Sequence, residues 1–188
     1  MKTRERIIMS MIHLLEVQGY SATGLAEINA ASQTPKGSLY FHFPGGKVEI
    51  AQAAIRVAAE RTAQKLKTAL AHRDLGVAIA AYVGMVAEDL RASEFCRGCP
   101  VANVAAELAA SQEDLRQACE QAYFLWFGLL EQRLAQAGIV SSQAKVWANL
   151  ILSAVEGALL LSRTYRSTEP LDLLARQLPE ILPVGVNP

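Results

Sequence analysis

Side chains that support covalent or metal-based chemistry are scarce in this sequence. Three cysteines and three histidines occur among 188 residues. No Ser/His/Asp set, phosphate-binding glycine loop or cluster of metal ligands can be identified. These absences favour a binding protein over an enzyme, and we predict that the protein uses no cofactor and no metal ion.

The alternating apolar and polar runs of β-strands are also missing, and β-branched residues seldom cluster. Alanine contributes 31 residues, and apolar residues make up 52% of the chain. This composition is typical of an all-helical protein and too apolar for an intrinsically disordered one. We therefore predict an all-α fold, in a chain long enough for one large domain or two small ones.

No hydrophobic run is predicted to cross a membrane. The most apolar stretch, residues 148–162, contains Glu156 and is shorter than the roughly 20 residues that a bilayer requires. The charged first residues continue into an amphipathic pattern and not into a signal peptide. We expect a cytoplasmic protein with reduced cysteines and no membrane partner.

Neither sign of charge is in excess, because 18 basic residues face 18 acidic ones. A protein that coats nucleic acid with its whole surface is therefore excluded. Residues 1–47 carry five basic and three acidic side chains, a net charge of +2, and the remaining 141 residues carry −2 (13 basic against 15 acidic). A dimer would double this asymmetry at one end of the molecule.

The periodicity of the apolar residues predicts helices along most of the chain. Gly19 ends the first helix, Thr23 is a good N-cap for the second, and Thr34 with Pro35 suits the start of the third. The predicted helices cover residues 3–18, 23–32, 35–43, 47–72, 74–90, 101–110, 111–137, 141–165 (starting at either serine) and a short segment from Pro170.

Residues 23–43 have the spacing of a helix-turn-helix, whose second helix enters the major groove of DNA. Two helices this short would be unstable alone. In the second one, Leu39 and Phe43 point together and form the buried stripe, whereas Phe41 points away from them. A glycine in so short a helix, Gly37, suggests close approach to another surface.

The outward face suits DNA because an exposed Phe41 can contact thymine methyl groups. Basic and polar side chains that can reach phosphates flank it: Lys36, Tyr40, His42 and Lys47. Alternatively, Phe41 packs on the fourth helix and Gly37 only serves packing.

The basic residues at the N-terminus are open to two interpretations. Lys2, Arg4 and Arg6 either form a solvated helix start or contact the DNA backbone.

Residues 4–50, above all PKGSLYFHFPGGKVEI, resemble the DNA-binding domain of the TetR family of bacterial one-component repressors. The segment RGCPVANVAAE at residues 97–107 resembles its LmrA/YxaF-like branch. The resemblance implies a three-helix DNA-binding domain over residues 1–47 and a helical-bundle effector and dimerisation domain over residues 48–188. The positions that match the family's DNA contacts are Thr23, Thr34, Lys36, Gly37, Ser38, Tyr40, Phe41, His42 and Lys47, and Gln33 replaces the glycine usual before the recognition helix.

The late helices predict a dimer. Helix 112–137 is apolar on more than one face, so both sides must be covered. A four-helix interface would cover them, and the TetR resemblance implies a homodimer through helices 112–137 and 142–165. Gly157, with Ala154 and Ala158, would permit close approach across the two-fold axis.

Polar residues within apolar helices, together with aromatic residues, suggest a mostly apolar effector pocket. For each residue the alternative is an ordinary helical core. The branch resemblance implies planar aromatic or multidrug-type effectors. The candidate lining residues are Tyr82, Met85, Phe95, Asn103, Glu107, Tyr123, Trp126, Phe127, Trp147 and Glu156.

The complete sequence predicts a ligand-responsive repressor that binds a pseudo-palindromic double-stranded DNA operator as a dimer. A small apolar or aromatic effector would release it by shifting helix 47–72. The alternative is an oxidant-sensing regulator or a thiol oxidoreductase that uses Cys96 and Cys99. No βαβ pattern accompanies this CxxC pair, and Cys119 with distant histidines makes a poor zinc site.

Overall fold

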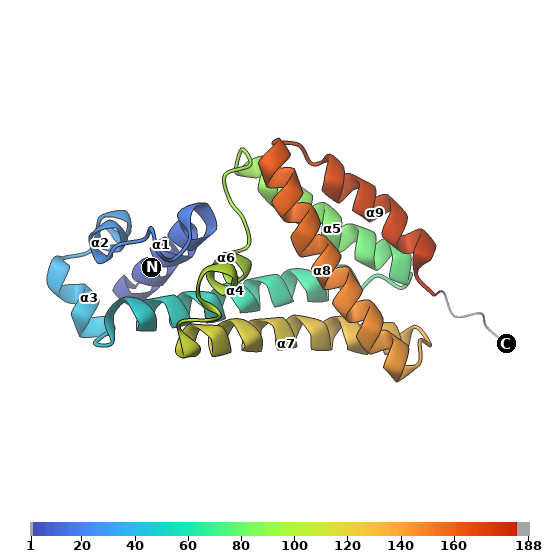
Figure 1. Cartoon of the computed structure of the whole chain (residues 1–188), viewed down its shortest axis with the longest axis horizontal. Helices are drawn as coiled ribbons and strands as arrows, with labels where there is room; N and C mark the ends of the chain where they lie inside the picture. The colour runs from blue at the N-terminus through green and yellow to red at the C-terminus, as the bar shows by residue number, and fades with distance from the viewer. Residues whose placement is uncertain (1, 184–188) are drawn as a thin grey trace. The chain divides into compact units, whose positions relative to one another are not determined.

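The computed structural model describes residues 2–183, apart from the side chain of Lys36. Within these residues all regular structure is helical, in agreement with the all-α prediction (Figure 1). Most predicted helices begin and end within two residues of the observed bounds. The helices are α1 (Thr3–Gln18), α2 (Leu25–Ser32), α3 (Lys36–His42), α4 (Gly46–Leu70), α5 (Leu75–Ala92), α6 (Pro100–Leu108), α7 (Glu113–Gln136), α8 (Ser141–Tyr165) and α9 (Glu169–Ile181).

The chain forms two compact units, which differ from the sequence-based division after residue 47. The N-terminal unit comprises Met1–Glu60 and Gly98–Ala122, and the C-terminal unit comprises Arg61–Arg97 and Tyr123–Pro188. Helix α6 therefore belongs with the first three helices, although it follows α5 in the sequence. Its contacts with α1 explain this placement, because sequence order alone does not determine which surface a helix covers.

The core of the N-terminal unit fixes the two short helices α2 and α3 against α1. The predicted buried stripe of α3 is confirmed, since Leu39 and Phe43 are both buried. Helices of eight and seven residues depend on such tertiary contacts. Helix α1 contacts both α2 and α3, and the fully buried side chains of α1 and α2 include Ile7, Met11, Leu15 and Ile28.

The turn between α2 and α3 is built by a left-handed residue. Gln33 adopts φ +51°, the conformation that a glycine would take without strain. Its carbonyl accepts a hydrogen bond from the Arg6 guanidinium at 3.3 Å, and its backbone amide bonds to Ala30 O. These contacts hold the turn although the usual glycine is missing.

Thr34 does not cap α3, contrary to the prediction. Its hydroxyl is buried, 2.8 Å from the Ser32 hydroxyl and 3.4 Å from Asn29 Oδ1. The residue before the first helical position of α3 is Pro35, which has no side-chain acceptor. Thr34 therefore stabilises the turn and presents no hydroxyl to DNA.

Thr23 is likewise not the N-cap of α2, because Gly24 occupies that position. The Thr23 hydroxyl is fully buried and donates to the Gly19 carbonyl at 2.6 Å. Glu27 accepts the Gly24 amide at 2.7 Å and so satisfies the helix start. The Thr23 hydroxyl is therefore engaged within the unit, and a DNA contact at this position stays a prediction.

In the C-terminal unit, α9 lies alongside α5 and α8 (Figure 1). Gly76 permits the contact with α9, because a Cβ at this position would lie 3.0 Å from the Pro179 Cβ. Further along, the Arg91 guanidinium donates to the Thr168 hydroxyl at 2.9 Å, and Thr168 donates to Asp172 at 2.9 Å. Helices α5 and α9 are therefore in contact at both of their ends.

The α8 helix is longer than the apolar stretch considered in the sequence. It spans 25 residues, and by length and composition alone it could cross a membrane, contrary to the expectation that it is too short. This is a weak indication, since core helices of soluble proteins pass the same test. One face of α8 is buried in the unit, whereas Val146, Leu150 and Leu160 on the other face are exposed.

Two phenylalanines of the helix-turn-helix at residues 23–43, hereafter the recognition segment, test this architecture directly. Phe43→Ala should lower the free energy of unfolding by about 3–5 kcal/mol, because it leaves a cavity in the N-terminal core. Phe41→Ala, two residues earlier, should change it by less than about 0.5 kcal/mol, because the ring is exposed. Urea unfolding followed by circular dichroism measures both, and equal losses would contradict the placement of the two rings.

Candidate nucleic-acid interface

The outward face of α3 is apolar and open. Phe41 is 82% exposed, the highest value among the large hydrophobic side chains of the described residues, and Tyr40 is 60% exposed. Gly37 lies on the same side, where a Cβ would meet no atom within 4 Å. The His42 ring meets the Phe41 ring edge-on, with centroids 5.1 Å apart. The outward position of Phe41 is confirmed, and packing on the fourth helix is ruled out.

This face has few hydrogen-bonding groups for base edges. From Gly37 to Phe41 the only polar side chains are the hydroxyls of Ser38 and Tyr40. Guanine and adenine are usually read by Arg, Lys, Asn or Gln, whereas the C5-methyl group of thymine accepts apolar contact. The face is therefore suited to a stretch of major groove that presents thymine methyls.

The basic residues of α1 make contacts inside the unit. The Arg4 guanidinium lies 5.1 Å from the centroid of the buried Phe43 ring, and Arg6 donates to the carbonyl of Gln33. Both therefore contact the recognition segment. Arg4 is nevertheless exposed, and a contact of these residues with the DNA backbone stays a prediction.

Lys47, at the beginning of α4, lies beside the turn between α1 and α2. Its ammonium group is 3.9 Å from the centroid of the Tyr20 ring, a cation–π contact. Burial lowers the pKa of Lys47, while the carboxylates of Glu107 and Glu27 act in the opposite direction. The second lysine predicted here, Lys36, has its side chain outside the part of the chain that the structure describes.

Glu107 completes a group that we call the turn cluster: Tyr20, Ser21, Lys47 and Glu107. The Glu107 carboxylate accepts the backbone amides of Tyr20 at 2.9 Å and Ser21 at 2.7 Å. Burial alone would raise the pKa of Glu107, but the hydrogen bonds from Ser21 and Tyr20 and the Lys47 charge outweigh it, so the pKa is lowered. The cluster joins α6, α4 and the turn within the N-terminal unit.

The placement of Asn103 and Glu107 corrects their assignment to an effector pocket. Asn103 donates to the Leu15 carbonyl at 2.8 Å, so both polar residues of α6 are engaged with the end of α1 and the following turn. In the sequence, the only indication of a shared role for these two residues is that they lie four positions apart on an otherwise apolar helix. That signal was misassigned, because a sequence does not show which neighbour a polar pair faces.

Comparison with known families decides what this chain is. Residues 12–54 match the tetR family of bacterial regulatory proteins, and residues 76–177 match the C-terminal domain of LmrA/YxaF-like transcriptional regulators. The chain belongs to the TetR family. The first match covers the recognition segment, and the second confirms the branch indicated by the sequence.

Individual relatives agree with the assignment to the TetR family along almost the whole chain. The HTH-type transcriptional regulator LmrA of Bacillus subtilis is 36% identical over 181 residues, which cover 96% of each chain. YxaF of the same organism is 33% identical, covering 96% of this chain and 95% of its own. The crystal structure of regulatory protein TetR from Rhodobacter sphaeroides superposes with a TM-score of 0.85 at 25% identity, covering 94% of this chain and 96% of the other.

The TetR-family assignment establishes a DNA-binding transcriptional regulator with a helix-turn-helix, and not an enzyme. The thiol oxidoreductase alternative is therefore wrong. Cys99 serves the fold, because its sulfur accepts the Ala102 amide at 3.4 Å at the start of α6. Burial raises the pKa of the Cys119 thiol to about 11, which keeps it protonated, and Cys96 is exposed. Among residues 2–183, no three His, Cys, Asp or Glu side chains form a group able to hold a metal ion.

The remaining candidate pocket residues of this TetR-family regulator all lie in the C-terminal unit. The Tyr123 and Trp126 rings meet edge-on, with centroids 5.4 Å apart. In the same unit, the Ser162 hydroxyl is buried and has no hydrogen-bond partner among the described residues. Tyr82 and Trp126 are buried, and the half-buried residues are Met85, Phe95, Tyr123, Phe127, Trp147 and Glu156.

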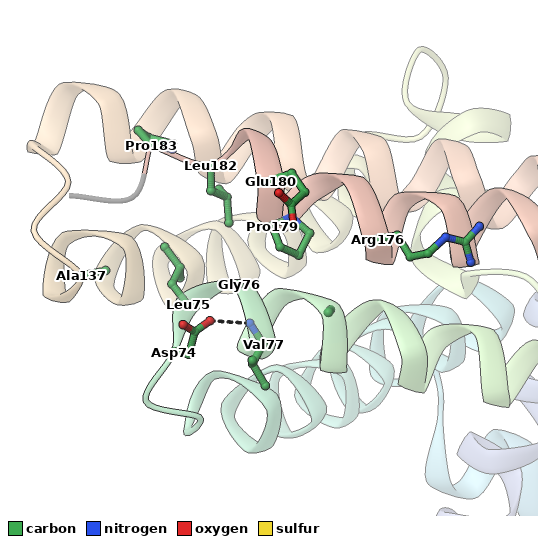
Figure 2. Close-up of a pocket in the computed structure, with 11 residues that line it drawn as sticks. Asp74, Leu75, Gly76, Val77, Ala137, Arg176, Pro179, Glu180, Leu182 and Pro183 are labelled. Atoms are coloured by element: carbon green, nitrogen blue, oxygen red, sulfur yellow. Dashed lines mark hydrogen bonds between the residues drawn. The ribbon is translucent and has the colours of Figure 1, made fainter. Parts of the chain in front are cut away.

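The C-terminal unit also has an open groove of about 510 Å³ between the start of α5 and the end of α9 (Figure 2). None of the predicted pocket residues lines it. The Asp74 carboxylate is already engaged, since it accepts the Val77 amide at 2.8 Å and caps α5. Figure 2 shows Arg176 pointing away from the other labelled side chains. The polar side chains of the groove therefore do not converge on a ligand position.

The lowered pKa of Glu107 predicts a pH-dependent contribution to stability. A carboxylate with a lowered folded-state pKa stabilises the fold above its ordinary value of 4.5, and this effect is lost as the pH falls through the folded-state value. The difference in urea midpoint between wild type and Glu107→Gln should therefore be largest near pH 7 and shrink below about pH 4.5. A difference that is constant from pH 7 to pH 3.5 would show that ionised Glu107 does not stabilise the turn.

Proposed function

We propose that this TetR-family regulator binds a pseudo-palindromic operator as a homodimer, with one α3 helix in each half-site, and represses transcription until a small-molecule effector releases it. Its place of action is the cytoplasm, where bacterial DNA lies. The observation that carries the proposal is the exposed Tyr40–Phe41 face of α3, held out by the buried Leu39 and Phe43. Contact with DNA would cover this apolar face, which is otherwise exposed to water.

Base recognition and phosphate contact are divided between different residues of the interface. Phe41, next to the open Gly37, contacts thymine methyls, and Ser38 lies on the adjoining face. Phosphate contacts fix the register of the helix in the groove but carry no sequence information directly. The residues proposed for them are Lys36, Tyr40, His42 and Lys47.

The dimer interface is proposed on the exposed faces of α7 and α8. Val146 and Leu150 are exposed four positions apart on α8, Leu160 is exposed nearer its end, and Phe124 is exposed on α7. Gly157 and Gly128 lie on the same faces, and a Cβ at either position would meet no atom within 4 Å. A glycine inside a helix costs about 1 kcal/mol relative to alanine, and close approach of a second chain explains its presence twice.

The effector is proposed to bind among the aromatic residues of the C-terminal unit. A mostly apolar cavity with few polar groups suits a planar aromatic molecule, and the unpartnered Ser162 hydroxyl is a group that such a ligand would satisfy. Helix α4 has residues in both units and would carry the change to α3. Effector and operator must then oppose each other by the same coupling free energy, typically about 1–3 kcal/mol.

The DNA-binding proposal is tested on duplexes that the wild-type protein selects from a random-sequence library. Phe41→Ala should weaken binding at least about tenfold without changing the salt dependence, because the ring carries no charge. Replacing the contacted thymines by deoxyuridine should weaken wild-type binding but have little effect on Phe41→Ala. Fluorescence anisotropy at two salt concentrations measures both effects.

Leu173→Ala provides the control, because Leu173 is an exposed apolar residue of α9 in the other unit. It should bind the selected duplexes as the wild type does. Failure of the wild type to prefer any sequence, or full binding by Phe41→Ala, would contradict the proposed recognition face.

The dimer is tested with two glycine substitutions that should be harmless within one chain. Gly157→Leu should shift the protein to a monomer, raising the dimer dissociation constant by about 100-fold or more, because the side chain separates the paired helices. Gly84→Leu is the matched control, since Gly84 is also exposed with no atom within 4 Å of its Cβ position. Sedimentation velocity distinguishes them, and a dimeric Gly157→Leu protein would place the interface elsewhere.

A further inference from the structure

We infer that Glu107 is a positioning residue for DNA binding. By accepting two backbone amides of the turn between α1 and α2, it fixes the position of the helix-turn-helix within the N-terminal unit. This inference rests on the proposed operator binding and adds a residue outside the recognition segment. It makes α6 a part of the DNA-binding machinery and not only of the C-terminal half of the sequence.

The first step concerns the hydrogen bonds between the end of α1 and the segment that comprises α6 and the residues just before it. Asn103 supplies a donor to the Leu15 carbonyl at 2.8 Å, and the Gly98 amide donates to the Glu16 carbonyl at 2.9 Å. Carbonyls at the end of a helix lack partners within that helix. After the helix end, the turn has backbone amides that need an acceptor, and the Glu107 carboxylate accepts two of them. Residues 98–107 thus supply donors where α1 ends in free carbonyls and an acceptor where the following turn has free amides.

The second step is the close fit of the carboxylate against Gly19. This residue is buried and has φ +80°. A Cβ built on it would overlap the Oε1 atom of Glu107. The carboxylate therefore occupies the space that a side chain would take, and any larger residue at this position must displace it.

The third step leads from the turn to the recognition helix along two paths. On one path the turn continues into α2. The side-chain amide of Gln18, the last residue of α1, donates to the Ala22 carbonyl at 3.0 Å, and Glu27 of α2 accepts the Gly24 amide. On the other path the Tyr20 ring lies under the Lys47 ammonium at the start of α4. Helix α3 lies between α2 and α4 in the chain. Both of these neighbouring helices therefore contact or continue from the same turn, the one between α1 and α2.

The role is positional because the core of the unit does not depend on Glu107. The carboxylate is at the surface, whereas α2 and α3 are held to α1 by Ile28, Leu39 and Phe43 in the interior. Without Glu107 the unit keeps this core but loses the partner of two amides. The turn is then free to shift, and the separation of the two recognition helices in a dimer is no longer fixed.

The test compares Glu107→Gln with wild type on a duplex that the wild type selects. Glutamine keeps the size, but its amide group faces a backbone N–H with a donor. Specific affinity should fall about tenfold, equivalent to about 1.4 kcal/mol, while affinity for a scrambled duplex stays unchanged. Glu113→Gln is the matched control, because Glu113 is an exposed carboxylate of the same unit that pairs with Arg116 on its own helix.

Two further measurements separate positioning from loss of structure. Amide exchange at Tyr20 and Ser21 should accelerate in Glu107→Gln, while the buried amides of α1 keep their protection. Gly19→Ala should weaken specific binding at least as much, because it displaces the carboxylate and also strains the backbone at φ +80°. The double variant should be no worse than Gly19→Ala alone, because the Glu107 contact is already lost in that variant.

The outcomes are distinguishable. A wild-type protein without any sequence preference would overturn the proposed function and this inference with it. If the wild type is specific and Glu107→Gln binds within twofold of it although both amides are released, this inference alone is overturned. Equal losses for specific and scrambled duplexes would also overturn it, since they indicate a general loss of structure.

Discussion

Two helices of eight and seven residues form the helix-turn-helix, and helices of this length are not stable alone in water. Their existence depends on burying a few side chains against α1. Once Leu39 and Phe43 are buried, the 3.6-residue period of the helix forces Phe41 outward. The packing that stabilises α3 and the exposure of the Phe41 ring are therefore consequences of one arrangement.

Polar contacts then fix what apolar packing leaves loose. Apolar contacts are not directional, so they hold α2 and α3 on α1 without specifying the turns around them. Arg6 defines the turn before α3, and Glu107 defines the turn before α2. Both act on backbone atoms and not on side chains of the recognition segment. In the proposed dimer on two half-sites such contacts would matter, because a small displacement of the turns changes the spacing of both recognition helices.

The C-terminal unit shows the opposite balance, with apolar surface left uncovered. The outer face of α8 and the exposed Phe124 of α7 have the character of a protein interior cut open. The same excess of apolar residues explains why α8 passes a test for membrane spans by composition. The proposed association with a second chain would account for both properties.

The sequence by itself determined the helical class, the family, the position of nearly every helix and the outward direction of Phe41. Each of these follows from local periodicity or from a contiguous motif. Only the tertiary structure decided that Thr23 and Thr34 are buried, that Gln33 takes a left-handed conformation, and that Asn103 and Glu107 serve the end of α1. These outcomes depend on partners far apart in the chain: 87 residues separate Glu107 from Tyr20. Hydrogen-bonding capacity can be read from a residue type, but the identity of the partner is determined only when distant segments pack together.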